Sequence, residues 1–232
     1  MHDRPRGPTH TERHAKPGGG ERRLTRLAPH DDATYRRLLA PWVPAIERSL
    51  GPGVYANRAV RGARVGPWAP ARRAWRIAAL SAFATAEASV VMSDVRDCYG
   101  SMGERAMRAL AIPEELGAFL RALRDEGVRG LPVGPDPSAI LANGILAIAD
   151  RAAAAEAGGH PIRWVDDVVL VAAGRRSATR AFDAWRRALE DLGLEANDAK
   201  TRWLDGRGAA RVVSTGPGST PSGPRHGIIA AP

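Results

Sequence analysis

Two short apolar runs carry aspartates at positions where a chain normally buries hydrocarbon. Residues 89–95 (SVVMSDV) are rich in β-branched side chains and contain Asp94, and residues 162–172 (IRWVDDVVLVA) enclose Asp166 and Asp167. Apolar β-branched runs of this length favour buried strands. A carboxylate buried without a partner is costly, so it must be paired, neutralised by a raised pKa, or bound to a cation. These three aspartates therefore constrain both the fold and the chemistry.

Segments with helix-like apolar spacing or helix-forming composition surround the two runs. They are residues 31–50, 71–88, 101–111, 113–126, 138–155 and 177–192. Residues 54–70 look irregular, residues 130–137 (GLPVGPDP) favour a loop, and residues 201–205 favour a last strand. The aspartate pair predicts a turn between two short strands. This order of elements predicts an α+β fold, in which a small, mainly antiparallel sheet carries helices on one face.

Composition favours a soluble, cytoplasmic protein with one domain. The chain has 232 residues, of which 44% are hydrophobic, enough to bury a proper core. No apolar stretch reaches the roughly 20 residues that a membrane helix needs, and the N-terminus has no apolar signal region. The single cysteine, Cys98, excludes an internal disulfide framework.

The formal charge of +9 favours a nucleic-acid partner, but an arginine bias weakens that signal, because only two of the 34 basic residues are lysines. Residues 1–26 carry +4 and residues 208–232 carry +2, which leaves +3 for residues 27–207. Both ends are rich in glycine and proline, so we expect a disordered basic tail over 1–26 and a second disordered tail over 208–232. The first tail is either merely solvated or an arm that helps to hold nucleic acid.

The aspartate pair has two interpretations. Aspartate favours turns, so the pair can simply close a hairpin. Alternatively, the turn lifts both carboxylates to the edge of the sheet, where they meet Asp94 from a neighbouring strand. Three carboxylates repel one another unless a hard cation neutralises them, and Mg²⁺ suits oxygen ligands and retains waters for substrate phosphates. Two such ions about 3.5–4 Å apart stabilise the attacking and leaving oxygens of phosphoryl transfer.

Four segments in order resemble the palm motifs of reverse transcriptases, the RNA-directed DNA polymerases. They are SDVRDCYGS (93–101), GLPVGPDPSAILAN (130–143), RWVDDVVLVA (163–172) and LEDLGLEANDAKT (189–201). Each motif alone is weak, and their order over residues 89–204 is the stronger signal. The segment GLPVGP is similar to the corresponding motif of a divergent bacterial branch, which includes abortive-infection and other phage-defence reverse transcriptases.

The resemblance implies a polymerase palm with a ferredoxin-like βαββαβ sheet over residues 89–207, a reduced fingers-like region over 27–88 and no evident thumb. It implies a nucleotidyltransferase that adds dNTPs to a 3′-hydroxyl or a protein hydroxyl with two Mg²⁺ or Mn²⁺ ions. The residues that match the catalytic metal ligands are Asp94, Asp166 and Asp167. Those that match nucleotide-binding positions are Val95, Tyr99, Gly134, Ser138 and Lys200, with Tyr99 as the steric filter against a ribose 2′-hydroxyl.

A cluster of arginines without acids precedes the first motif and is a candidate surface for template or triphosphate, although arginine bias alone can produce it. Its members are Arg58, Arg61, Arg64, Arg72, Arg73 and Arg76.

The sequence departs from the family at Val133, where glutamine is frequent, and at Trp164, where tyrosine is usual. The alternative function is a degenerate or partial palm that binds nucleic acid or a partner chain without catalysis. A cyclic-dinucleotide synthase is disfavoured because its hairpin motif is absent.

Overall fold

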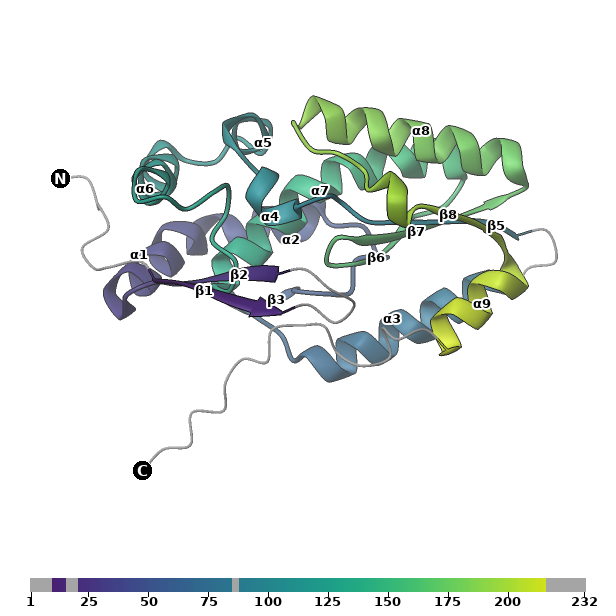
Figure 1. Ribbon diagram of the computed structural model, residues 1–232, viewed down its shortest axis with the longest axis horizontal. Helices are drawn as coiled ribbons and strands as arrows, with labels where there is room; N and C mark the ends of the chain where they lie inside the picture. The colour runs from purple at the N-terminus through teal and green to yellow at the C-terminus, as the bar shows by residue number, and fades with distance from the viewer. Residues whose placement is uncertain (1–9, 16–20, 85–87, 216–232) are drawn as a thin grey trace.

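A four-stranded antiparallel sheet forms the centre of the protein (Figure 1). The computed structural model describes residues 10–15, 21–84 and 88–215. The sheet has the order β6-β7-β5-β8, built from β5 (Ala88–Ser93), β6 (Ile162–Trp164), β7 (Asp167–Ala173) and β8 (Arg202–Asp205). Helices separate β5 from β6 and β7 from β8, while β6 and β7 form a hairpin. The predicted α+β class and small antiparallel sheet are confirmed.

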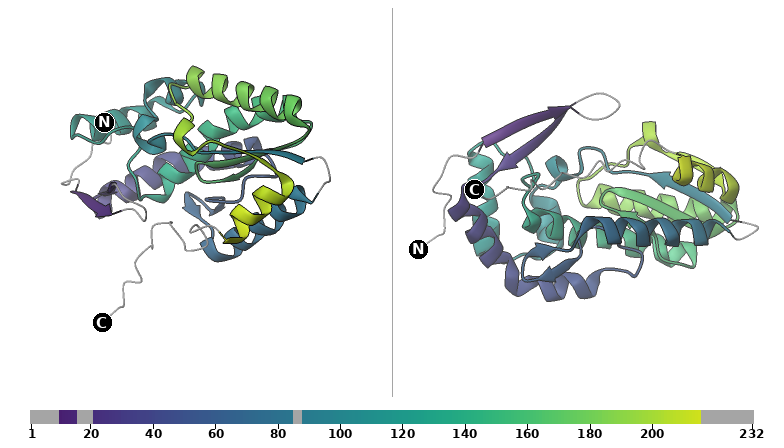
Figure 2. Two further views of the ribbon diagram at one scale, coloured as in Figure 1. Left: turned by 45° about the vertical axis from the view of Figure 1, so that its right-hand side comes forward. Right: turned by 90° about the horizontal axis from the view of Figure 1, so that it is seen from below.

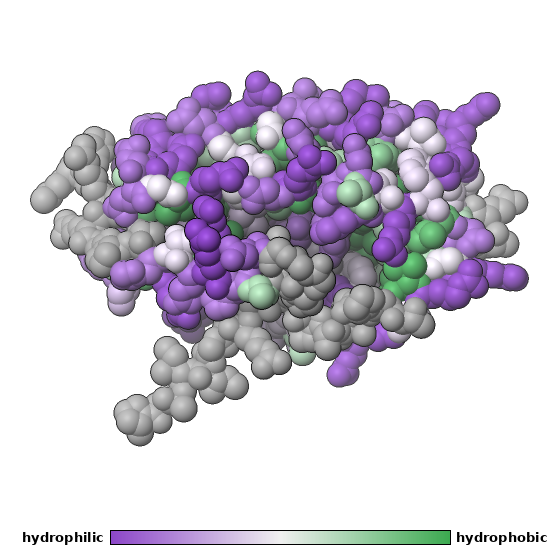
Figure 3. Space-filling model, in the orientation of Figure 1, coloured by the Kyte–Doolittle hydropathy of each residue, from purple (hydrophilic) through white to green (hydrophobic). Residues whose placement is uncertain are grey.

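One face of the sheet packs against α7 (Asp136–Ala157) and α8 (Arg175–Asp191). Val91 and Leu170 project from this face into the larger core, which also contains Trp185 of α8. By length and hydropathy α7 would also pass as a membrane span, but most of it is buried inside the protein, and that burial accounts for its apolar composition. Hydrophilic side chains cover α8 where it faces outward (Figure 3).

The other face of the sheet is covered by α3 (Trp68–Phe83) and α9 (Gly206–Thr215), which pack against each other below the sheet in Figure 1. Val90 and Val169 point to this side, because successive residues of a strand face opposite ways, and they meet Trp75 and Ala209. The prediction of helices on one face only was therefore wrong. Residues 208–215, expected in a disordered tail, belong instead to α9; residues 216–232 lie outside the described part.

Shorter helices flank α7 at the end of the protein away from α9 (Figures 1 and 2). They are α1 (Pro29–Leu39), the 3₁₀ helix η1 (Ala40–Trp42), α2 (Val43–Ser49), α4 (Cys98–Ser101), α5 (Glu104–Ala109) and α6 (Glu114–Asp125). The helix predicted over 31–50 is thus interrupted near Pro41 and Pro44, as the missing backbone N–H groups require. The rings of Tyr35 and Phe119 join α1 to α6, with centroids 5.5 Å apart.

Two small hairpins lie outside the sheet. The first pairs β1 (His10–Ala15) with β2 (Glu21–Arg26) and stands out from the helical body in the second view of Figure 2. The second pairs β3 (Ala59–Arg61) with β4 (Arg64–Val65) within the segment expected to be irregular. The N–H of Thr25 donates to the carbonyl oxygen of Val133 at 2.7 Å, so β2 is attached to the loop before α7. The described residues within 1–26 therefore form a docked hairpin and not the expected disordered tail.

Candidate active site

The aspartate-bearing ends of β5 and β7, the two central strands, lie side by side where these strands end, and this end of the strands is called the sheet edge below. β5 ends at Ser93, which is paired with Val168 of β7, so Asp94 follows directly beside the β6–β7 turn. That turn consists of Val165 and Asp166, since Trp164 is paired with Asp167 across it. The order of strands therefore brings Asp94 beside two carboxylates that lie more than seventy positions later in the chain.

Asp94 is the most deeply placed of the three carboxylates. Its residue is 4% exposed, and its Oδ2 accepts a hydrogen bond from Nζ of Lys200 at 2.5 Å. Its Oδ1 is buried and has no hydrogen-bond partner among the described residues. An unsatisfied buried carboxylate oxygen is costly, and a bound cation is one way to satisfy it.

Backbone pairing beyond the sheet fixes the position of Lys200. The N–H of Asn197 donates to the carbonyl oxygen of Asp94 at 2.8 Å, and Arg96 N donates to Glu195 O at 2.9 Å. Lys200 then ends the 3₁₀ helix η2 (Asp198–Lys200) and reaches back to Asp94. Its hydrogen bond to Asp94 raises the pKa of Lys200, which keeps the ammonium charged. The segment resembling the fourth motif is thus bound to the segment resembling the first.

Asp167 lies on the outer side of the same group, where its residue keeps contact with solvent. Loss of hydration, together with repulsion from Asp166 and Asp94, raises the pKa of Asp167 to about 7. The charges of Lys200 and Arg72 act in the opposite direction.

Arg72 approaches the aspartate pair from α3, on the second face of the sheet. Its guanidinium lies 4.1 Å from the ring centroid of Trp75 and 5.0 Å from that of Trp164. These are cation–π distances, so two aromatic rings hold the cation near Asp167. Burial lowers the pKa of Arg72, an effect that Asp167 opposes.

The donor set suits a hard divalent cation although the side chains are not gathered around one point. Across residues 10–15, 21–84 and 88–215, no three His, Cys, Asp or Glu side chains are close enough to hold a metal ion. At Asp94 the compensating charge is instead the ammonium of Lys200. Three neighbouring carboxylates, one with an unsatisfied buried oxygen, are nevertheless the ligand type that Mg²⁺ and Mn²⁺ prefer.

Tyr99 lies on α4, five residues after Asp94, and is attached to the loop before α7. Its carbonyl oxygen accepts the N–H of Leu131 at 2.9 Å. At Gly130, which has φ of 59°, a Cβ atom would lie 2.1 Å from that oxygen, so no other residue fits without displacement. Burial, and then the charges of Cys98 and Asp166, raise the pKa of the Tyr99 phenol. The phenol therefore lies close enough to Asp166 for that charge to act on it.

The remaining predicted nucleotide-binding residues are placed differently. Ser138 is fully buried, and its hydroxyl is 3.1 Å from that of Tyr35, so its side chain belongs to the core. Val95 is also buried and forms a β-bridge with Ala196. Gly134 has φ of 132°, which favours glycine, and a Cβ there would lie 3.2 Å from the carbonyl oxygen of Thr25.

The predicted arginine surface divides into two groups. Arg58 donates to Glu47 at 2.7 Å, Arg72 lies over the two tryptophans, and Arg76 donates to the carbonyl oxygen of Ser214 at 3.5 Å. Arg61 and Arg64 are exposed on the β3–β4 hairpin, and Arg73 is exposed on α3. These last three, together with Arg76, which is also exposed, have side chains accessible to a phosphate backbone.

Three buried polar residues near the turn were not anticipated from the sequence. They are Asn143 and Asp150 of α7 and Arg163 of β6. A charged residue inside the apolar run 162–172 was the available signal for Arg163, since an arginine is rarely fully buried unless it is paired.

Comparison with known proteins adds no relative: no protein-family model matches the chain, and no curated protein matches it.

The raised pKa of Asp167 predicts a pH-dependent gain in stability when its charge is removed. In the metal-free protein the folded-state pKa of about 7 exceeds the ordinary value of 3.8, so stability is lost as the pH rises through the folded value. Asp167→Asn should therefore raise the thermal midpoint more at pH 8 than at pH 5, measured by circular dichroism. The exposed Asp191→Asn is the control; an equal gain at both pH values would contradict the crowding of charge at Asp167.

Proposed function

We propose that the protein is a reverse-transcriptase-like nucleotidyltransferase that adds dNTPs to a 3′-hydroxyl, or to a protein hydroxyl, by two-metal-ion phosphoryl transfer. The observation that carries the proposal is the meeting of Asp94 with the Asp166–Asp167 turn at one sheet edge, with Lys200 and Tyr99 beside them. The succession of strands and helices, which matches a ferredoxin-like βαββαβ order, also supports the proposal.

In this proposal Asp94, Asp166 and Asp167 would hold two Mg²⁺ or Mn²⁺ ions, which would stabilise charge on the attacking and leaving oxygens. The attacking hydroxyl oxygen forms a bond to the α-phosphorus of the dNTP, and the bond from that phosphorus to the pyrophosphate oxygen breaks. Lys200, whose ammonium contacts Asp94, would meet the negative charge of the triphosphate. Tyr99 would lie under the sugar and disfavour a 2′-hydroxyl.

Exposed arginine pairs on the two outer hairpins support a nucleic-acid partner. Arg13 is directly opposite Arg23 on the β1–β2 hairpin, and Arg61 is opposite Arg64 on the β3–β4 hairpin. Like charges directly opposite each other destabilise a hairpin, and phosphates bound there would relieve the repulsion. With a modest charge elsewhere, we expect weak, salt-dependent binding and short products, with a partner protein or attached primer supplying the grip of a thumb.

The Asp94–Lys200 contact favours a second candidate function, a palm that binds nucleic acid or a partner chain without catalysis. In that case the ammonium would be a permanent substitute for metal, and the carboxylates would have only a structural role. Incorporation of labelled dNTPs by the purified protein, with Mg²⁺ or Mn²⁺ and varied templates, separates the two candidates.

Substitution of Asp166 tests the assigned chemistry. Asp166→Asn removes a ligand charge and changes little volume, so incorporation should fall by roughly a hundredfold or more while the fold persists. The fold is checked by circular dichroism, and Asp191→Asn, at the exposed last residue of α8, is the matched control. Full incorporation by Asp166→Asn would exclude this carboxylate from catalysis.

Substitution of Tyr99 tests the choice of sugar. Tyr99→Ala removes the ring that would meet a 2′-hydroxyl, so the ratio of rNTP to dNTP incorporation should rise by roughly tenfold or more. Tyr99→Phe keeps the ring and should leave the ratio unchanged. If Tyr99→Ala is folded and active and its ratio equals that of the wild type, Tyr99 is only a packing residue.

A further inference from the structure

A buried arginine lies directly beneath the turn that carries the aspartate pair. Arg163 is 1% exposed, and its guanidinium makes its hydrogen bonds inside the protein. Nε donates to Oδ2 of Asp150 at 2.7 Å, and Nη1 donates to Oδ1 of Asn143 at 2.8 Å. Nη1 also donates to the carbonyl oxygen of Val165 at 2.8 Å. The arginine therefore connects α7 to the first residue of the turn.

The turn needs such support because its backbone is strained. Val165 has φ of 56°, a value that β-branched residues rarely adopt and that hairpin loops normally assign to glycine, asparagine or aspartate. Four non-glycine residues in the described part of the chain have positive φ, and Asn57 is another of them. Backbone in such conformations persists only where surrounding contacts hold it.

The same network holds Asn57. The side-chain amide of Asn143 donates to the carbonyl oxygens of Ala56 and Asn57, at 2.9 and 3.2 Å. Asn143 thus accepts from Arg163 with its oxygen and donates to these carbonyls with its nitrogen. Two of the strained residues are therefore connected through one asparagine and one arginine.

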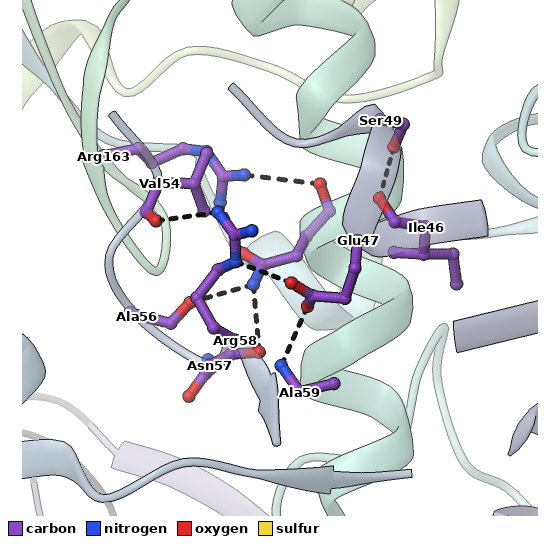
Figure 4. A network of polar contacts seen from close by, with 10 residues as sticks. Ile46, Glu47, Ser49, Val54, Ala56, Asn57, Arg58, Ala59 and Arg163 are labelled. Carbon is purple, nitrogen blue, oxygen red and sulfur yellow. Dashed lines mark hydrogen bonds and ion pairs between the residues drawn. The ribbon is translucent and has the colours of Figure 1, made fainter. Parts of the chain in front are cut away.

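Residues 53–59 form a strap that lies along β6 and continues to α2. Arg163 N donates to Gly53 O at 2.8 Å, and Tyr55 N donates to Arg163 O at 3.2 Å. At the other end of the strap, Glu47 of α2 accepts from Nε of Arg58 at 2.7 Å and from the N–H of Ala59 at 2.8 Å, and Figure 4 shows these contacts close to Arg163. The strap leads directly into the β3–β4 hairpin with its exposed arginines.

Stability alone does not explain an arginine at this position. A well-packed hydrophobic residue can often replace a buried ion pair without loss of stability. It could not hold the carbonyl oxygen of Val165 and the side chain of Asn143 at once, whereas the fixed fork of a guanidinium can.

We propose that Arg163, oriented by Asp150, is a positioning residue that fixes the Val165–Asp166 turn and, through Asn143, ties it to the strap of residues 53–59. The carboxylates of the turn then have fixed positions before any ligand binds. Hydrogen bonds through Asn143 join the turn to the strap, which leads to the β3–β4 hairpin. The positioning of metal ligands in particular rests on the proposed function; the holding of the turn does not.

Hydrogen–deuterium exchange on the metal-free protein tests the holding of the turn. Arg163→Lys keeps the charge and loses the fork, so amide exchange over residues 165–168 and 54–57 should accelerate by roughly tenfold, with little change in α8. Leu146→Ala, a core truncation on α7, is the control for general loss of stability. Asn143→Ser removes the hydrogen bonds to Ala56 and Asn57 but keeps the arginine, so it should accelerate exchange in the strap. This variant is the substitute test if Arg163→Lys does not fold.

The inference would be overturned if exchange over 165–168 and 54–57 rises no more in Arg163→Lys than in Leu146→Ala, or if exchange over 54–57 rises no more in Asn143→Ser than in Leu146→Ala. Binding of Mn²⁺ to the same proteins, followed by calorimetry, tests the metal role separately. Arg163→Lys should weaken it by roughly tenfold or more, the effect of losing a group that orients ligands, while Leu146→Ala should not. A wild-type protein that binds no Mn²⁺ would contradict the proposed function and leave the exchange result to decide this inference.

Discussion

Repulsion between Asp94, Asp166 and Asp167 is the interaction around which this end of the protein is organised. The strand order brings the three carboxylates to one edge of the sheet, where loss of hydration and the charges of Asp166 and Asp94 raise the pKa of Asp167. Lys200 compensates from the segment beside β5, and Arg72 compensates from α3. Two elements on different sides of the sheet, the segment that ends at Lys200 and α3, therefore supply the positive charges that face these carboxylates.

The side chains of Lys200 and Arg72 compensate the negative charge of the three carboxylates only in part, which leaves room for a cation. Oδ1 of Asp94 remains buried without a partner in the described residues, and the pKa of Asp167 stays well above its ordinary value. A hard divalent cation would satisfy both at once. The backbone that carries two of the three carboxylates is also strained at Val165, and Arg163 donates a hydrogen bond to the carbonyl oxygen of that residue.

Much of the central sheet could be predicted from local patterns, and the surroundings could not. The β-branched runs, the turn at the aspartate pair and the amphipathic helix over 177–192 each have a local cause, and each is present. The cover of α3 and α9 on the second face depends on long-range packing of Trp75 and Ala209, which no local period reveals. The β1–β2 hairpin was hidden by its polar composition, and no local pattern indicates that the hydroxyl of Ser138 contacts that of Tyr35. Arg163 was overlooked because arginine is common throughout the chain.

The most direct test of the central claim is the position of a metal ion in crystals soaked with Mn²⁺, located by its anomalous scattering. We expect a peak bounded by Asp94 and the Asp166–Asp167 turn, with Nζ of Lys200 moved away from Oδ2 of Asp94. An intact Lys200–Asp94 contact at saturating Mn²⁺, with no peak at this edge of the sheet, would contradict it.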